Sequence, residues 1–194
     1  MSGEHGELPV AARVRRLEER LIAAGLATDA ELDEILERVF TSASPVNGAR
    51  MVTRAWKDPG YRDRLLADGN AAAAELGFGA GTQGYLLKVV ENTPTVHNMI
   101  VCTLCSCYPT ALLGPSPSWY KSFAYRSRAV REPRAVLAEF GLELPDSTEI
   151  RVWDANSETR YLVVPLPAED ADEMAESELA SLVTRNGLIG TAIR

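Results

Sequence analysis

All three cysteines of this 194-residue chain lie within six consecutive positions, as Cys102, Cys105 and Cys107 of the segment CTLCSC. Three sulfurs cannot pair among themselves without one left over, and a disulfide between cysteines so close in sequence is strained. Thiolates are the ligands that soft metals prefer in proteins. The segment therefore predicts a metal-binding loop. A non-enzymatic metal carrier or a redox module would use the same three residues.

The side chains alone do not complete a familiar metal site. A structural zinc site or a four-cysteine iron-sulfur cluster needs a fourth ligand, and the only histidines are His5 and His97. His97 lies in an apolar run with strand-like spacing, which favours a structural, hydrogen-bonded role. The backbone offers an alternative, because deprotonated amide nitrogens of Ser106 and Cys107 would bring the donor set to two nitrogens and three sulfurs. The sixth position of an octahedral metal would stay open.

The segment VCTLCSC and its surroundings resemble the alpha subunit of nitrile hydratase, a non-haem iron or non-corrin cobalt enzyme that hydrates nitriles to amides. The gamma subunit of thiocyanate hydrolase carries a similar CTLCSC segment, so the motif identifies the metal centre better than the substrate. The resemblance extends through GARMVTRAWKDPGYRDRLLADG at 48–69, ENTPTVHN at 91–98, WYKSFAYRSRAVREPRAVL at 119–137, and VWD with RYLVVP within 152–165.

The resemblance implies roles for the residues of the loop. Cys102 would be an axial thiolate, and Cys105 and Cys107 would be oxidised to sulfinate and sulfenate. Together with the amides of Ser106 and Cys107, they would hold a low-spin trivalent metal. A nitrile at the open position would be attacked by an activated water or by the sulfenate oxygen of Cys107. Thr103 favours non-corrin Co(III), with Fe(III) as the alternative, because cobalt-type members usually have threonine there.

Two residues outside the loop are candidate catalytic residues by the same resemblance. Gln83 matches a polar residue near the metal, and Glu75 matches a buried acid expected to form hydrogen bonds with it. The resemblance also implies a beta subunit, or two split beta-like subunits as in the enzyme that acts on toyocamycin, and a metallochaperone or activator. The substrate would be a small nitrile.

Composition limits the other classes of function. The chain has 46% hydrophobic residues and a net charge of -7, which fits a globular domain and argues against a nucleic-acid partner. No apolar run reaches the length of a membrane span, and the first residues lack the pattern of a secretory leader. We therefore expect a cytoplasmic protein that does not associate with membranes.

The expected fold class is α+β, with an N-terminal helical arm over residues 1–44 and a mixed metal-binding catalytic domain over residues 45–194. Apolar spacing predicts helices over 10–26 and 32–40, the second after a Thr28–Glu31 capping box. The arm would either reach across a partner subunit or fold on its own domain. Further helices are expected over 48–56, 61–66, 71–76, 125–140 and 177–183.

Short β-branched runs predict strands over 85–90 and 96–101, and the second would deliver Cys102. The runs over 150–153 and 160–164 predict a β-hairpin around Asn156 and Ser157. The chain between the cysteines and Trp119 is expected to be irregular. Four arginines within 126–134 form a basic cluster, which would be either a solvated helix face or an ion-pair surface for an acidic partner.

Overall fold

The structure is a computed structural model that describes residues 9–194, apart from the side chains of residues 38–41. The predictions about the leader and His5 therefore lie outside the described residues. The chain divides into two compact units, Met1–Thr41 and Ser42–Arg194. None of the helices within residues 9–194 combines the length and apolar character needed to cross a membrane.

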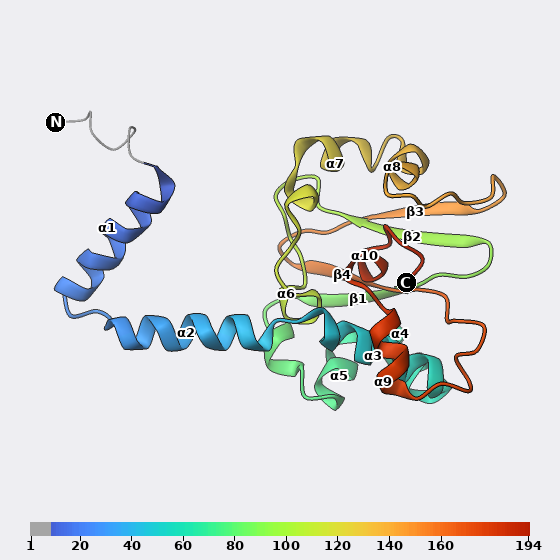
Figure 1. Ribbon diagram of the computed structural model, residues 1–194, viewed down its shortest axis with the longest axis horizontal. Coiled ribbons are helices and arrows are strands. Elements are labelled where there is room, and N and C mark those ends of the chain that lie inside the picture. The colour runs from blue at the N-terminus through green and yellow to red at the C-terminus, as the bar shows by residue number, and fades with distance from the viewer. Residues whose placement is uncertain (1–8) are drawn as a thin grey trace. The chain divides into compact units, whose positions relative to one another are not determined.

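The N-terminal unit holds helices α1 (Val10–Ala23) and α2 (Asp29–Ser42) (Figure 1), as predicted. The capping box also forms, because the backbone N–H and hydroxyl of Thr28 both donate to Glu31 while the N–H of Glu31 donates back. In α1 no side chain is buried, and Val14 and Leu17 are each 57% exposed. The helix thus forms but leaves its apolar stripe uncovered. The last apolar positions of the helix predicted over 32–40, Val39 and Phe40, lie among the side chains that the structure does not describe.

Three consecutive helices begin the second unit: α3 (Pro45–Lys57), α4 (Pro59–Ala67) and α5 (Gly69–Glu75). The side chains of Ser44, Asp58 and Asp68 precede these three helices, and each accepts a hydrogen bond from a backbone N–H in the first turn. The helices predicted over 48–56 and 61–66 are separate, because Pro59 begins α4 rather than continuing α3. The 3₁₀ helix η1 (Gly79–Thr82) follows α5.

Four strands form two parallel pairs, and together with the helices they confirm an α+β fold. Strand β1 (Leu86–Glu91) pairs with β4 (Thr159–Val164), and β2 (Val96–Val101) pairs with β3 (Glu149–Asp154). The predicted hairpin between the last two strands is therefore wrong. Strands β3 and β4 instead each pair with an earlier strand, because strand pairing is decided by partners distant in the sequence. Figure 1 shows the strands between α7 and α8 on one side and α3, α5 and α9 on the other.

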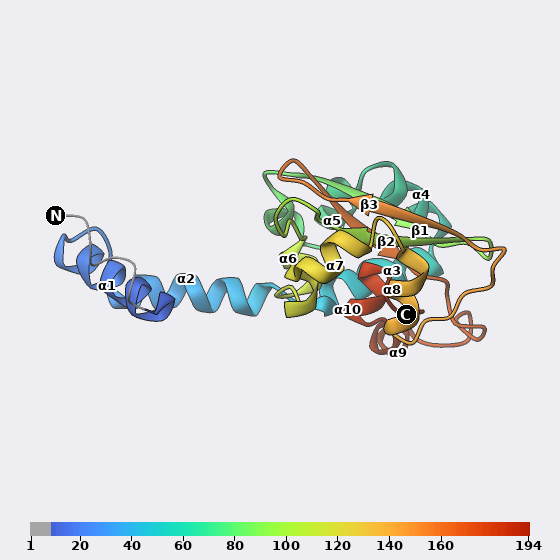
Figure 2. The same cartoon turned by 90° about the horizontal axis from the view of Figure 1, so that it is seen from above.

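The predicted helix over 125–140 is in fact two helices, α7 (Phe123–Arg128) and α8 (Pro133–Glu139). Pro133 lacks an N–H and pushes Glu132 out of the helical region, so the chain restarts at the proline. The region expected to be irregular contains α6 (Thr110–Leu113) and the 3₁₀ helix η2 (Ser118–Lys121). Figure 2 shows α7 and α8 on the same face of the unit. Helices α9 (Glu176–Leu182) and α10 (Arg185–Ile189) end the chain.

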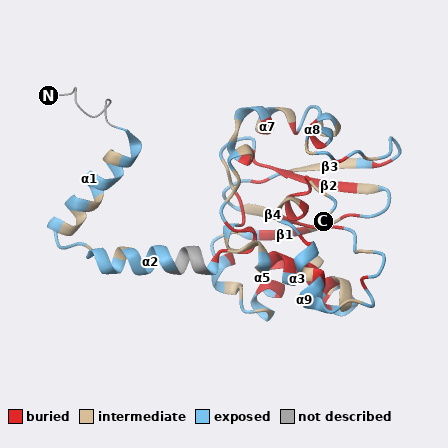
Figure 3. Cartoon of the chain, viewed as in Figure 1, coloured by how far each residue is buried: buried red, intermediate tan, exposed pale blue. Residues whose placement is uncertain are grey.

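The core lies along the strands and the inner face of α3, as the buried residues in Figure 3 show. Buried His97 is part of it. Its Nε2 lies 2.8 Å from the carbonyl oxygen of Gly190 and its Nδ1 lies 3.3 Å from the Asn92 amide. Gly190 ends α10 with φ +87° and approaches the backbone of β2 so closely that a Cβ would clash with Asn98. His97 therefore connects β2 to the end of the chain, the structural role expected of it.

Candidate metal centre

The cysteine loop starts where two parallel strands end. Val101, the last residue of β2, lies beside Asp154, the last residue of β3, and its carbonyl accepts a hydrogen bond of 2.7 Å from the N–H of Ala155. Cys102 follows directly, and it is completely buried. Strand ends that are held by parallel pairing are rigid supports for a loop that carries chemistry.

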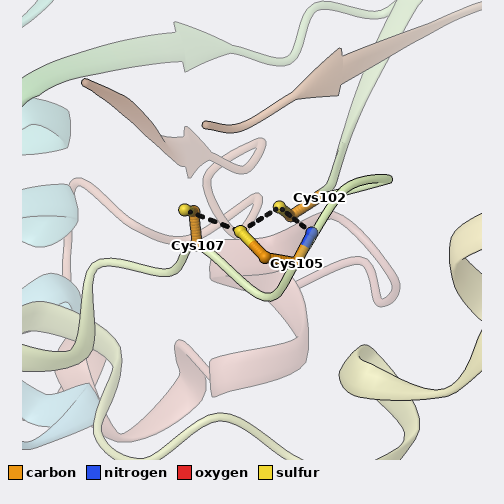
Figure 4. Close-up of side chains that lie close together, drawn as sticks. All are labelled: Cys102, Cys105 and Cys107. Atoms are coloured by element: carbon orange, nitrogen blue, oxygen red, sulfur yellow. Dashed lines mark hydrogen bonds between the residues drawn. The ribbon is translucent and has the colours of Figure 1, made fainter. Parts of the chain in front are cut away.

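The three sulfurs converge at this position. The Sγ of Cys105 lies 3.4 Å from the Sγ of Cys102 and 3.1 Å from the Sγ of Cys107. All three sulfurs lie within 4.8 Å of one another (Figure 4). These separations are far longer than the ~2.05 Å of a disulfide bond. Cys102 is buried, Cys107 is half-buried and Cys105 is exposed, so the cluster opens toward solvent on one side.

The thiols have different acidities. Hydrogen bonding to the thiol of Cys107, then to Cys102, and donation from the backbone N–H groups of Ser106 and Cys107 lower the pKa of Cys105 to about 7. Burial, followed by the hydrogen bond to Cys105, raises the pKa of Cys107 to about 12. Cys105 is therefore the first of this pair to form a thiolate. Among the backbone N–H groups of the loop, that of Cys105 donates to the Sγ of Cys102 at 3.3 Å.

Residues distant in sequence hold the backbone of the loop. Asp154 accepts hydrogen bonds from the backbone N–H of Thr103, at 2.9 Å, and from its hydroxyl, at 2.5 Å. Tyr120 of η2 donates its hydroxyl to the carbonyl of Cys107 at 3.1 Å. The sequence patterns did not indicate either contact. Asp154 lies near the loop because β3 pairs in parallel with β2, and no local pattern in the sequence indicated this pairing.

Arg126 of α7 makes the most extensive contacts with the loop. Its Nε donates to the carbonyl of Cys102 at 3.1 Å, and its Nη2 donates to the carbonyls of Thr103 and Leu104, each at 2.7 Å. Tyr125, the residue before Arg126, donates its hydroxyl to the carbonyl of Ile100 at 2.5 Å. Helix α7 therefore supports both the end of β2 and the first half of the loop.

Three of the four arginines in the predicted basic cluster make contacts within this unit, whereas Arg131 is exposed. Besides Arg126, Arg128 pairs with Glu132 and Glu139 within the same unit. Arg134 donates to the carbonyls of residues 144, 145 and 148. These three arginines serve internal contacts, because backbone carbonyls and carboxylates of α7, α8 and the following loop lie within their reach.

The two other candidate residues lie outside the sulfur cluster. Glu75 is exposed, with 41% of its side chain accessible, and forms a two-bond ion pair with Arg64 at 2.9 Å. Within this chain Glu75 is therefore not buried, because α4 supplies a cation at the surface. Gln83 is exposed and follows η1. No hydrogen bond joins the side chains of Glu75 and Gln83, both within the described part of the chain.

The donor set suits a soft metal. Three sulfurs converge without a carboxylate or imidazole ligand among the described residues of the cluster. Sulfur donors exclude the oxygen-preferring ions calcium and magnesium as natural occupants.

A sequence profile of the family described as nitrile hydratase, alpha chain, matches residues 8–192. The chain belongs to the nitrile hydratase alpha-chain family. The resemblance drawn from the CTLCSC segment is thereby confirmed. The chain is 48% identical over 190 residues to the cobalt-containing nitrile hydratase subunit alpha of Pseudonocardia thermophila, which covers 97% of this chain and 93% of that protein.

Solved structures of this family and of a related enzyme share the fold. A double histidine mutant of the Fe-type nitrile hydratase from Comamonas testosteroni Ni1 superposes with a TM-score of 0.88 at 40% identity, covering 95% of this chain and 91% of that one. A recombinant thiocyanate hydrolase comprising partially modified cobalt centres gives a TM-score of 0.87 at 40% identity, covering 96% and 91%. The nitrile hydratase alpha-chain fold is thus common to proteins named for different metals and substrates.

Proposed function

We propose that this chain is the metal-bearing alpha subunit of a nitrile hydratase, which hydrates a nitrile to the amide. One observation carries the proposal: three sulfurs converge at the end of β2 in a member of the nitrile hydratase alpha-chain family. Thiocyanate hydrolase is the second candidate, because a member of that enzyme class matches the fold equally well.

The proposed ligands are the sulfurs of Cys102, Cys105 and Cys107 and the deprotonated amides of Ser106 and Cys107. Trivalent cobalt is the proposed metal, because Thr103 is the cobalt-type residue and because relatives with 48% identity are named as cobalt-containing. Iron is the alternative, since a similar structure is named Fe-type. When bound, such a metal supplies the Lewis acidity that makes a nitrile carbon electrophilic.

The burial of the three cysteines supports different roles for them. Cys102 is fully buried and would hold the metal from the protein interior, whereas Cys105 and Cys107 lie at the solvent-exposed side of the cluster. We propose that Cys105 is oxidised to the sulfinate and Cys107 to the sulfenate. The sulfenate oxygen of Cys107 would then attack the nitrile or activate the attacking water.

Gln83 is proposed as a polar residue near this open side. It follows η1, and Gly81 of η1 packs so tightly on Ala111 of α6 that a Cβ would lie 2.4 Å from that methyl group. Helix α6 starts three residues after Cys107, so η1 lies beside the end of the cysteine loop. Glu75, one helix earlier, would join this network only if its ion pair with Arg64 opens.

A partner chain is part of the proposal. Sulfinate and sulfenate groups need cationic donors, and Arg126, which contacts the loop, donates to its carbonyls instead of its sulfurs. Helix α1 leaves its apolar residues exposed, which supports an arm that packs on another subunit. We therefore propose a beta subunit or split beta-like subunits, a metallochaperone or activator for metal insertion, and a cytoplasmic location.

The test is to express the chain with its candidate partner chains and to assay the purified complex with a small aliphatic nitrile and with thiocyanate. We expect amide formation from the nitrile, much slower hydrolysis of thiocyanate, and little turnover by the chain alone. Faster hydrolysis of thiocyanate would favour the second candidate. Freely exchanging metal and no turnover with either substrate would leave the metal-carrier interpretation.

A further inference from the structure

The carbonyl groups at the start of the cysteine loop are arranged around one cation. Three consecutive carbonyls, of Cys102, Thr103 and Leu104, point at the guanidinium of Arg126. Neighbouring carbonyls in a strand point in alternating directions, so this arrangement brings like ends of dipoles together. A positive group with several N–H donors, placed between the three carbonyl oxygens, offsets that repulsion. The planar guanidinium of Arg126 is such a group.

Two residues fix helix α7, which carries Arg126, and a third contacts the Arg126 side chain itself. Helix α7 is capped by Ser122, whose hydroxyl accepts from the N–H of Tyr125. The buried ring of Tyr125 packs edge-on against Trp119 and donates its hydroxyl to β2. The guanidinium carbon of Arg126 also lies 5.3 Å above the centre of the Phe123 ring. A side chain fixed in this way can impose a shape on the loop.

The contact with Leu104 reaches one of the sulfurs. The carbonyl of Leu104 belongs to the same peptide group as the N–H of Cys105, and that N–H donates to the Sγ of Cys102 at 3.3 Å. A cation on the carbonyl oxygen polarises the peptide group and strengthens its N–H as a donor. Arg126 therefore acts on the buried Cys102 sulfur through one peptide group, without touching it.

We propose that Arg126 is a positioning residue of the metal centre, which fixes the turn from Cys102 to Cys105 and tunes how strongly the Cys102 sulfur donates to the metal. The second half of this proposal rests on the proposed function, because it needs a metal bound by Cys102. The first half concerns the chain itself and holds without metal.

The loop geometry is tested on the metal-free chain by amide hydrogen exchange. Replacing Arg126 by Gln removes the charge and most of the donors, so we expect exchange at the N–H of Cys105 to accelerate about tenfold or more. Arg128→Gln is the matched control, because Arg128 lies on the same helix but pairs with Glu132 and Glu139 instead of the loop. Equal exchange rates at Cys105 in the Arg126→Gln and control proteins would overturn the positioning role.

The effect on the metal is tested on the assembled complex loaded with cobalt, by its sulfur-to-metal charge-transfer absorption and by elemental analysis. Arg126→Lys keeps the charge but cannot span three carbonyls, so we expect a shifted absorption band and partial metal retention. The Arg128→Gln complex should keep the parent band. If Arg126→Gln does not fold, Arg126→Lys decides alone, and a parent-like band with full cobalt content would overturn the proposal. Because neither readout is turnover, a complex inactive toward nitriles would refute the proposed function without refuting this inference.

Discussion

Asp154 binds Thr103 twice, through the backbone N–H and through the hydroxyl, and so joins the end of β3 to the second residue of the cysteine loop. The two residues are 51 positions apart in sequence. This contact gives Thr103 a structural task in the loop, in addition to its value as an indicator of the metal.

The Asp154–Thr103 contact should stabilise the loop measurably. We expect Thr103→Val, which removes only the hydroxyl, and Asp154→Ala each to lower the free energy of unfolding by about 1 kcal/mol, since both residues are exposed and the bonds are charge-assisted. Denaturant unfolding of the single and double variants measures the coupling. Effects that simply add would show that the pair does not interact in solution.

The three cysteines should act as one ligand set. Cys102→Ser, Cys105→Ser and Cys107→Ser should each lose metal or activity, because a neutral hydroxyl is a poor substitute for a thiolate. His97→Asn is the control and should retain the metal, since both nitrogens of His97 face Asn92 and Gly190. Elemental analysis of the purified proteins decides, and loss of metal from the His97 variant would make that histidine a ligand.

His97 should make the fold sensitive to acid. Burial lowers the pKa of His97, although its hydrogen bond to the carbonyl of Gly190 opposes the shift. The unfolded chain, with a histidine pKa of about 6.5, therefore binds this proton first as the pH falls. The contribution of neutral His97 is fully present above about pH 6.5 and is lost as the pH falls toward the lower folded pKa.

Denaturant unfolding at pH 7.5 and pH 5.5 measures this contribution. We expect the parent chain to lose more stability between these pH values than His97→Asn, which has no proton to gain at that position. The variant will also be less stable at pH 7.5, because it loses the bond to Gly190. The same pH dependence in both proteins would show that His97 is not the acid-sensitive group.

Metal identity and cysteine oxidation should be observed together. Protein made with its maturation partners should contain about one cobalt per chain. Peptide mass spectrometry should find two added oxygens on Cys105, one on Cys107 and none on Cys102, because oxygen modifies exposed metal-bound thiolates. Iron would contradict only the inference from Thr103. Zinc with three unoxidised cysteines in active protein would contradict the proposed mechanism.

Local patterns in the sequence predicted the parts of the fold that depend on neighbouring residues. The Thr28–Glu31 capping box and the strand that ends just before Cys102 both appear in the structure. The cysteine loop was recognisable because its ligands lie within six positions. The hairpin at 150–164 failed because strand pairing depends on distant partners, and β1 and β2 occupy the edges that a hairpin would have used.

The support of the loop could not be predicted for the same reason. Arg126 appeared as one member of a surface cluster, since helical spacing says nothing about which carbonyls a long side chain reaches. Glu75 was expected to be buried, but Arg64 on the preceding helix draws it into a surface ion pair. Contacts with residues outside the local segment determine the positions of both side chains, and local patterns in a single sequence do not reveal such contacts.

The parallel pairing of β2 with β3 also sets the order in which the protein can mature. Tyr120, Arg126 and Asp154, which form hydrogen bonds to the loop, all follow Cys107 in the chain. The ribosome therefore synthesises the three cysteines before these residues. Long-range contacts of this kind form late in folding. A nascent chain that ends before Asp154 presents three thiols on an unsupported segment, and insertion of the metal at the finished geometry must therefore follow synthesis of β3.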